Sequence, residues 1–176
     1  VTNGFINPEP LNQLLEYIDA VNVDLKGDDE FYEKICGGKL KPVIDSIKII
    51  HDSGVWLEIT NLLIPGLNDS HEQISRLADF VARLDKNIPL HFSAFYPCYK
   101  LNNIKSTPLE TLRRASNIAK AKGLKYVYFG NVNEGNDTSC PNCKQQVIKR
   151  DYFYNIKNKL KKGKCSCKQE IAGVWQ

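Results

Sequence analysis

Long hydrophobic runs are absent from the 176-residue sequence. The run at residues 62–65 is typical of the longest, whereas a helix that spans a bilayer needs about 20 consecutive apolar residues. Collagen-like repeats, coiled-coil heptads and low-complexity segments are missing as well. These absences exclude a membrane-spanning helix within the 176 residues, so we expect no membrane partner.

Methionine is also absent, and the chain starts at Val1. Because translation begins with methionine, we expect the chain to be a fragment or a processed form whose N-terminal part is missing. Residues 1–3 already resemble the end of a strand. The lack of a signal peptide therefore says little about the native start.

Charge is plentiful but unevenly distributed. Hydrophobic residues make up 42% and charged residues 25%, which suits one domain with a small appendage. Residues 1–140 carry 15 basic and 18 acidic residues, whereas residues 141–176 carry 9 basic and 2 acidic residues. The basic tail is either a solvated helix face or a surface for nucleic acid. No aromatic stripe accompanies the lysines, so nucleic acid is the less favoured partner.

Short β-rich runs alternate with amphipathic helical segments over the first 130 residues. We expect five strands, at residues 1–3, 20–25, 55–63, 90–95 and 125–129. This alternation predicts an α/β fold with parallel strands and outer helices. A closed eight-stranded barrel needs roughly 250 residues. The pattern therefore fits an open sheet or a partial (βα) barrel of the TIM type.

Two of the expected helices begin with a recognisable cap. Ser70 followed by Gln73 three residues later predicts a capping box. Thr107 and Glu110 repeat this pattern around Pro108. After residue 133 the βα pattern gives way to a turn-rich linker. We therefore expect two parts, a barrel part at 1–135 and a cysteine-bearing, ribbon-like tail at 136–176.

The tail contains four cysteines in two close pairs. Cys140 and Cys143 are separated by two residues, Cys165 and Cys167 by one, and 21 residues lie between the pairs. Four thiolates suit a tetrahedral structural zinc site, although a one-residue spacer makes a tighter chelate than usual. Two disulfides, free thiols, a different metal and an empty site are the alternatives. Such a zinc would hold a ribbon together, because four thiolates leave no open position.

The other two cysteines, Cys36 and Cys98, stand apart, and no Cys-x3-Cys-x2-Cys occurs in the chain. An ordinary thiol is the favoured interpretation of both. Gly-rich phosphate loops are missing too, which argues against an open α/β domain that binds a phosphorylated ligand at its strand ends.

Functional groups of parallel α/β folds lie at the carboxyl ends of the strands. Asp24 and Lys26 alternate at such an end and should point to the same face. They could hold a zwitterionic ligand or a cation, or form a rim salt bridge of little energetic weight. Tyr96 ends the next-to-last expected strand, and is better placed for a ligand than His91, which we expect in the core.

Several strings, in this order, resemble radical S-adenosylmethionine (SAM) enzymes akin to the pyruvate formate-lyase activating enzyme. The nearest subfamily in this resemblance is the AmmeMemoRadiSam system radical SAM protein. The strings are VTNGF at 1–5, NVDLK at 22–26, TNLLIPGLND at 60–69, HF at 91–92, YP at 96–97, YK at 99–100, VYFGNV at 127–132, TSCPNC at 138–143 and IAGVW at 171–175.

The resemblance implies the last strands of a partial (βα)6 barrel. In such enzymes three cysteines bind a [4Fe-4S] cluster, and reductive cleavage of SAM yields a 5′-deoxyadenosyl radical that abstracts hydrogen. The cluster cysteines would lie outside this chain, so we expect the chain alone to be inactive. A protein or small-molecule substrate, an electron donor and a cytoplasmic location are implied as well. The alternative is a zinc-ribbon binding module whose basic tail engages nucleic acid.

Site residues follow from the resemblance position by position. Asp24 and Lys26 match an Asp-x-Lys that lies close to SAM, and Thr2 and Asp24 match positions that help bind a cation beside it. Val1 stands where relatives often have Asp.

Tyr96 stands where relatives often have a histidine that reaches SAM. Its phenol can donate a hydrogen bond but is uncharged near neutral pH. Asn61, Leu63 and Asn131 are expected to line the barrel near the adenosine. The resemblance identifies no catalytic residue.

Overall fold

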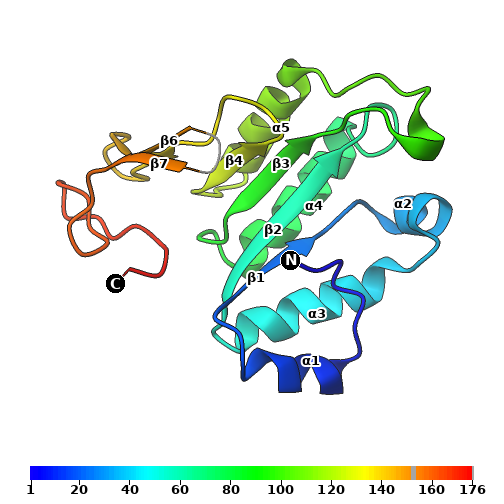
Figure 1. Cartoon of the computed structure of the whole chain (residues 1–176), viewed down its shortest axis with the longest axis horizontal. Coiled ribbons are helices and arrows are strands. Elements are labelled where there is room, and N and C mark those ends of the chain that lie inside the picture. The colour runs from blue at the N-terminus through cyan, green and yellow to red at the C-terminus, as the bar shows by residue number, and fades with distance from the viewer. Residues whose placement is uncertain (152–153, 176) are drawn as a thin grey trace.

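The computed structural model describes residues 1–151 and 154–175. Its main sheet has four strands in the order β1-β2-β3-β4 (Figure 1), and each strand pairs in parallel with the next. The strands are β1 Ala20–Asp24, β2 Trp56–Leu63, β3 Leu90–Ala94 and β4 Val127–Gly130. The structure thus confirms the predicted alternation of helices with parallel strands.

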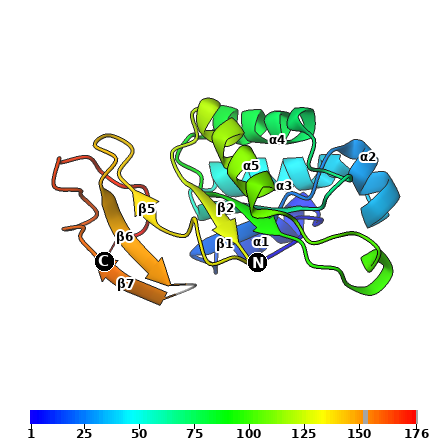
Figure 2. The same ribbon diagram turned by 90° about the horizontal axis from the view of Figure 1, so that it is seen from above.

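Helices connect the strands and cover one face of the sheet. Figure 2 shows α3, α4 and α5 along that face. The helices are α1 Pro8–Leu15, α2 Asp29–Phe31, α3 Leu40–Asp52, α4 His71–Leu84 and α5 Leu109–Ala121. A π-helical turn at Tyr32–Cys36 follows α2, and a 3-10 turn at Tyr99–Leu101 follows β3. None of the helices in the described residues is long and apolar enough to cross a membrane.

The main core lies between this face of the sheet and the helices. Alternate residues of β2 and β3 point into it, among them the fully buried Ile59, Leu90 and Phe92. From the helix side, Ile47 of α3 and Leu112 of α5 close the same cluster without exposed surface. The opposite positions of each strand are only half-buried, so the second face of the sheet stays open.

We expect Phe92→Ala to destabilise the chain by about 3–5 kcal/mol, because it leaves a cavity among close-packed side chains. Ser93→Ala is the matched control, since Ser93 is half-buried on the opposite face, and it should cost less than about 1 kcal/mol. Urea unfolding followed by circular dichroism measures both. Equal losses for the two variants would contradict the assignment of the two faces.

The two predicted capping boxes have different outcomes. Ser70 accepts a hydrogen bond from the Gln73 N–H, and Gln73 accepts one from the Ser70 N–H, as predicted. Thr107 does not cap α5, whose N-cap is Pro108. Its hydroxyl instead donates to the carbonyl of Leu63 and accepts from the Phe95 N–H, which ties the ends of β2 and β3 together.

The segment after β4 forms a second, antiparallel sheet in the order β5-β6-β7. Its strands are β5 Thr138–Ser139, β6 Gln146–Asp151 and β7 Tyr154–Asn158. The expected helix of the basic tail is therefore wrong, because these residues pair as a β-hairpin. The expected first strand at residues 1–3 shrinks to one parallel bridge between Thr2 and Val23. The boundary at residue 135 stays a prediction.

Contacts attach the second sheet and the residues after it, 136–175, to the edge of the main sheet; we call this segment the C-terminal module. Arg113 of α5 forms a two-pronged ion pair with Glu134 just before the module, at 2.9 and 3.0 Å. The Tyr126 hydroxyl accepts a hydrogen bond from the Ala172 N–H at 3.0 Å. Tyr126 also belongs to the module's small buried cluster. The module therefore stands beside the open face of the main sheet.

Candidate functional site

The open face of the main sheet is polar. Parallel strands buried on both faces are nearly continuous hydrophobic runs, whereas β1, β2 and β3 alternate apolar and polar residues. The register aligns four of the outward residues in one row across the sheet, where each pairs with the next: Asp24, Thr60, His91 and Tyr128. A groove of about 1180 Å³ runs between this face and the C-terminal module.

Asp24 and Lys26 form an ion pair at the carboxyl end of β1. Lys26 Nζ lies 2.7 Å from Asp24 Oδ2, and both side chains are about one-third exposed. The prediction that they share a face is therefore confirmed. Tyr32 braces this end, because its hydroxyl accepts from the Lys26 N–H and donates to the Asp24 carbonyl. Burial raises the pKa of Tyr32 to about 12, so this phenol keeps its proton.

Thr2 lies beside Asp24, because the Asp24 N–H donates to the Thr2 carbonyl and the Thr2 N–H donates to the Asn22 carbonyl. The Thr2 hydroxyl accepts from the N–H of Gly4. The loop after β2 is held against the same end by Asn68, whose amide nitrogen donates to the carbonyls of Lys26 and Leu62. Three separate segments thus meet at the carboxyl end of β1.

Tyr96 and Asn131 meet at the carboxyl ends of β3 and β4. The Tyr96 hydroxyl donates to the Asn131 carbonyl at 2.9 Å, and the Asn131 amide donates to the Ala94 carbonyl at 3.0 Å. Both residues line the groove. Tyr96 is half-exposed, which leaves one side of its ring open to a ligand.

Asn61 and Leu63 lie on the other face of the sheet. Alternation along β2 directs them toward the helices, where Asn61 is 2% exposed and Leu63 is fully buried. The Asn61 amide donates to the Leu25 carbonyl at 2.7 Å and so ties β2 to the end of β1. These two side chains are separate from the groove, and their predicted place near an adenosine stays a prediction.

The structure gives His91 a half-buried partner, Glu58, which the sequence analysis did not identify. Glu58 on β2 accepts hydrogen bonds from Trp56 Nε1 at 3.0 Å and pairs with His91 Nε2 at 2.7 Å. Burial raises the pKa of Glu58, but the bonds from His91 and Trp56 outweigh it, so the pKa lies below its ordinary value. His91 is thus hydrogen-bonded as expected, yet it faces the groove rather than the core.

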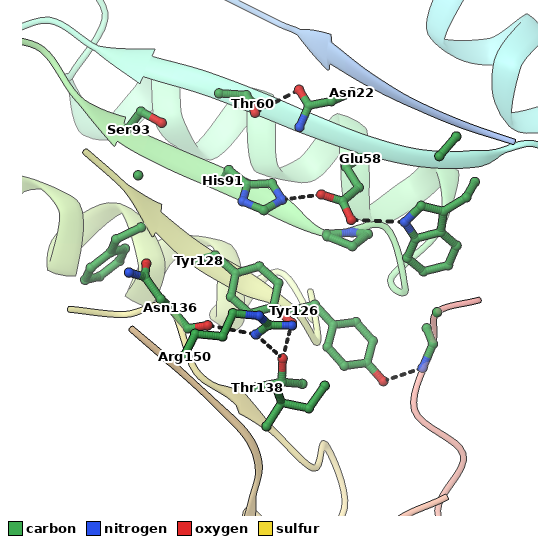
Figure 3. Close-up of a pocket in the computed structure, with 18 of the residues that line it drawn as sticks. Asn22, Glu58, Thr60, His91, Ser93, Tyr126, Tyr128, Asn136, Thr138 and Arg150 are labelled. Atoms are coloured by element: carbon green, nitrogen blue, oxygen red, sulfur yellow. Dashed lines mark hydrogen bonds and ion pairs between the residues drawn. The ribbon is translucent and has the colours of Figure 1, made fainter. Parts of the chain in front are cut away.

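Tyr128 links this pair to the C-terminal module. Its ring stacks on His91 with centroids 5.3 Å apart, and the guanidinium of Arg150 lies 5.5 Å from its centroid. Figure 3 shows the Tyr128 ring between His91 and Arg150. The Tyr128 hydroxyl lies 2.9 Å from Thr138 Oγ1. The alternation of polar and apolar residues along the strands could have placed Glu58 and Tyr128 on the open face. No sequence pattern places Arg150 there, because it lies on β6 of the second sheet.

The four tail cysteines come together in a group that could bind a metal. Their sulfur atoms all lie within 4.8 Å of one another. The Cys140–Cys167 and Cys143–Cys165 sulfur pairs are each 3.6 Å apart. Thiolates around one tetrahedral ion are about 3.8 Å apart, given a zinc–sulfur bond of about 2.3 Å. The geometry therefore matches one ion at the centre of the group.

The two cysteine loops share one backbone pattern despite their different spacers. The Cys140 N–H donates to the carbonyl of Gln145, and the Cys165 N–H donates to that of Gln169. Each loop closes through a lysine with positive φ, Lys144 or Lys168. The tight Cys-x-Cys spacer is therefore accommodated without loss of the loop's hydrogen bonds.

Backbone donors favour the thiolate form of Cys165 and Cys167. The Cys167 N–H lowers the pKa of the Cys165 thiol, and the Gln169 N–H lowers that of Cys167 to about 6. At Cys143 the Gln145 N–H also lowers the pKa, but side-chain hydrogen bonds with the other three cysteines outweigh it and raise the pKa to about 12. Cys36 and Cys98 are exposed and lie in other segments. Within the part of the chain that the structure describes, the tail group is the only cluster of three or more ligand residues of this kind.

Comparison with known proteins finds several that are similar to this chain. Residues 1–80 match the model of the Radical SAM superfamily. An uncharacterized protein of Methanocaldococcus jannaschii is 46% identical over 160 residues, which cover 89% of this chain and 47% of that protein. Pyruvate formate-lyase 1-activating enzyme of Escherichia coli is 27% identical over 141 residues, which cover 72% of this chain and 57% of the enzyme. The chain thus spans about half the length of these relatives.

A solved structure supports the same fold. A domain of a pyruvate-formate lyase-activating enzyme from Bacteroides vulgatus superposes with a TM-score of 0.66 at 17% identity, covering 74% of this chain and 80% of that one. The shared architecture is the parallel sheet with alternating helices. The match of residues 1–80 to the Radical SAM superfamily and the homology to pyruvate formate-lyase activating enzymes agree with this architecture.

Proposed function

We propose that this chain supplies the SAM-binding and substrate-facing part of a radical SAM enzyme of the activating type. The observation that carries the proposal is the polar open face of a family-typical sheet, which ends in the Asp24–Lys26 ion pair. When bound, SAM and a [4Fe-4S] cluster together supply a 5′-deoxyadenosyl radical that abstracts hydrogen. The protein's part is to bind, orient and shield these groups.

The residues at the carboxyl end of β1 fit SAM chemically. SAM carries an ammonium and a carboxylate on its methionyl part, and the Asp24 carboxylate and Lys26 ammonium offer complementary charges. Both remain partly exposed, so a ligand can reach them. At the carboxyl ends of β3 and β4, Tyr96 offers its phenol and Asn131 offers its backbone groups. We propose these four residues, with Thr2 nearby, as the SAM-binding set.

The residues of this chain do not fit a [4Fe-4S] cluster. Cys36 and Cys98 are single thiols on separate segments, and the four tail cysteines are arranged for one ion. In a four-iron cluster each thiolate binds a different iron, which holds the sulfur atoms further apart. We propose that the cluster ligands belong to the part of the whole protein that precedes Val1. No step of the chemistry is assigned to residues of this chain through the cluster.

We further propose zinc as the ion of the tail group, because four thiolates at tetrahedral spacing are typical of structural zinc. The activating-enzyme homologues suggest a protein substrate and an electron donor for the whole enzyme. A cytoplasmic location would suit reduced thiolates and a reduced cluster. The part at 136–176 would then be a metal-bearing extension of the barrel.

A test of the SAM-binding set uses the whole protein. We expect Asp24→Asn to weaken SAM binding by roughly tenfold or more, because it removes the charge that pairs with Lys26 and with the ligand's ammonium. Equilibrium dialysis with labelled SAM measures this. The matched control is Glu30→Gln, which breaks the exposed Glu30–Lys34 pair of the same 2.7 Å length. Unchanged SAM binding by a folded Asp24→Asn protein would refute the assignment.

A further inference from the structure

Arg150 is a half-buried arginine on β6 that lines the groove from the C-terminal module. Its Nη1 atom donates to the Asn136 carbonyl and to Thr138 Oγ1, both at 2.8 Å. Among the described residues no carboxylate forms an ion pair with it. The other arginines of the chain all have such a partner: Arg76, Arg83, Arg113 and Arg114. The charge of Arg150 is therefore not neutralised by direct contact.

The guanidinium is held in a fixed orientation. The Tyr128 ring lies against it, and two hydrogen bonds from Nη1 fix its plane (Figure 3). Within the described part of the chain, the Nε and Nη2 donors of Arg150 make no hydrogen bond. A planar guanidinium with a free pair of donors is suited to two-pronged binding of a carboxylate or a phosphate.

The acidic residues of the groove do not serve as its partner. Glu58 is occupied by His91 and Trp56. Asp19 is exposed and lies just before the amino end of β1. Tyr128 and His91 separate Glu58 from Arg150 in Figure 3. Asp137 of the module accepts from the backbone N–H of Arg150 and from Gln146 Nε2, and among the described residues it forms no ion pair with the guanidinium. The module thus presents the Arg150 guanidinium to the groove, opposite a wall whose carboxylate is already paired.

We propose that Arg150 binds an anionic group, a carboxylate or a phosphate, of the substrate that occupies this groove. The inference rests on the proposed function in taking the groove as the substrate side of the enzyme. It gives the metal-bearing module a direct part in substrate recognition, because β5 and β6 hold both Arg150 and its partner Thr138.

The chain itself provides the reporter for a test. Its two tryptophans, Trp56 and Trp175, both line the groove. Succinate and inorganic phosphate, titrated separately at constant ionic strength, are expected to change tryptophan fluorescence saturably. The probe with the lower dissociation constant identifies the preferred anion: succinate indicates a carboxylate and inorganic phosphate indicates a phosphate. The absence of a saturable change with both probes would overturn the proposal.

Two variants distinguish a specific contribution of Arg150 to anion binding from the general effect of positive charge on the module. Arg150→Gln is expected to raise the dissociation constant roughly tenfold or more. Lys149→Gln removes an exposed neighbouring charge. This variant should change the dissociation constant by less than about twofold. An Arg150→Gln protein that binds as the unmodified chain does would overturn the proposal.

A measurement on the unmodified chain covers the case in which Arg150→Gln fails to fold. The Arg150 Nε–H signal in NMR spectra should shift with the same dissociation constant as the fluorescence, and a stationary signal at saturation would also overturn the proposal. Anion binding needs neither cluster nor SAM. Its failure is therefore distinct from a failure of the whole protein to cleave SAM, which would overturn the proposed function alone.

Discussion

Removal of the zinc that we propose for the tail group is expected to unfold the C-terminal module and to leave the four-stranded sheet folded. The module's buried cluster is small: besides Tyr126 of the main sheet it comprises Cys140, Cys165 and three aliphatic side chains, Val147, Ile148 and Ile171. So few apolar residues cannot balance the entropy of ordering about 40 residues. A structural zinc supplies about 10–16 kcal/mol in small zinc-binding peptides, so its loss should be decisive.

Chelator titration followed by two-dimensional NMR measures this effect residue by residue. Signals of β5, β6 and β7 should collapse toward unfolded positions, while those of the buried core around Phe92 stay in place. Cys140→Ser should do the same without chelator, because Cys140 is fully buried in the group. Cys98→Ser, at an exposed single cysteine, is the matched control. Elemental analysis that finds no bound metal, or a module that stays folded without one, would contradict the metal site.

Local sequence patterns predict the structure correctly where the contacts that decide it are also local. The Ser70–Gln73 capping box forms as predicted, because both partners lie within one turn. Thr107 carries the same pattern, but its hydroxyl bridges the ends of β2 and β3, where it donates to the Leu63 carbonyl and accepts from the Phe95 N–H. Hydrogen bonds to distant strands thus take the place of the local helix cap. The sequence around Thr107 does not indicate these bonds.

The basic tail shows the limit of charge patterns. The charge pattern predicts lysines on one face of a helix, whereas Lys149 and Lys157 lie in the paired strands β6 and β7, and Lys144 and Lys168 lie in the two cysteine loops. Ile148 of β6 is buried and the next residue, Lys149, is exposed, as alternation along a strand requires. Lys157 lies on the edge strand β7, where a lysine also opposes unwanted pairing with other strands.

The candidate site was predictable only in part. Asp24 and Lys26 were placed correctly on one face, because two residues on one strand need no knowledge of register. Asn61 and Leu63 lie on the helix-covered face of β2, opposite to Thr60, and their place near an adenosine stays a prediction. Arg150 reaches the groove through a separate sheet, and only the tertiary structure brings it to Tyr128.

We propose that this chain forms the SAM-binding part of a radical SAM enzyme and needs cluster ligands from elsewhere in the whole protein. The most direct test is anaerobic reconstitution with iron and sulfide, addition of SAM and a strong reductant, and quantification of 5′-deoxyadenosine. We expect the whole protein to form 5′-deoxyadenosine and residues 1–176 alone, treated identically, to form none. Formation by residues 1–176 alone, or none by the whole protein with its cluster bound, would contradict the account.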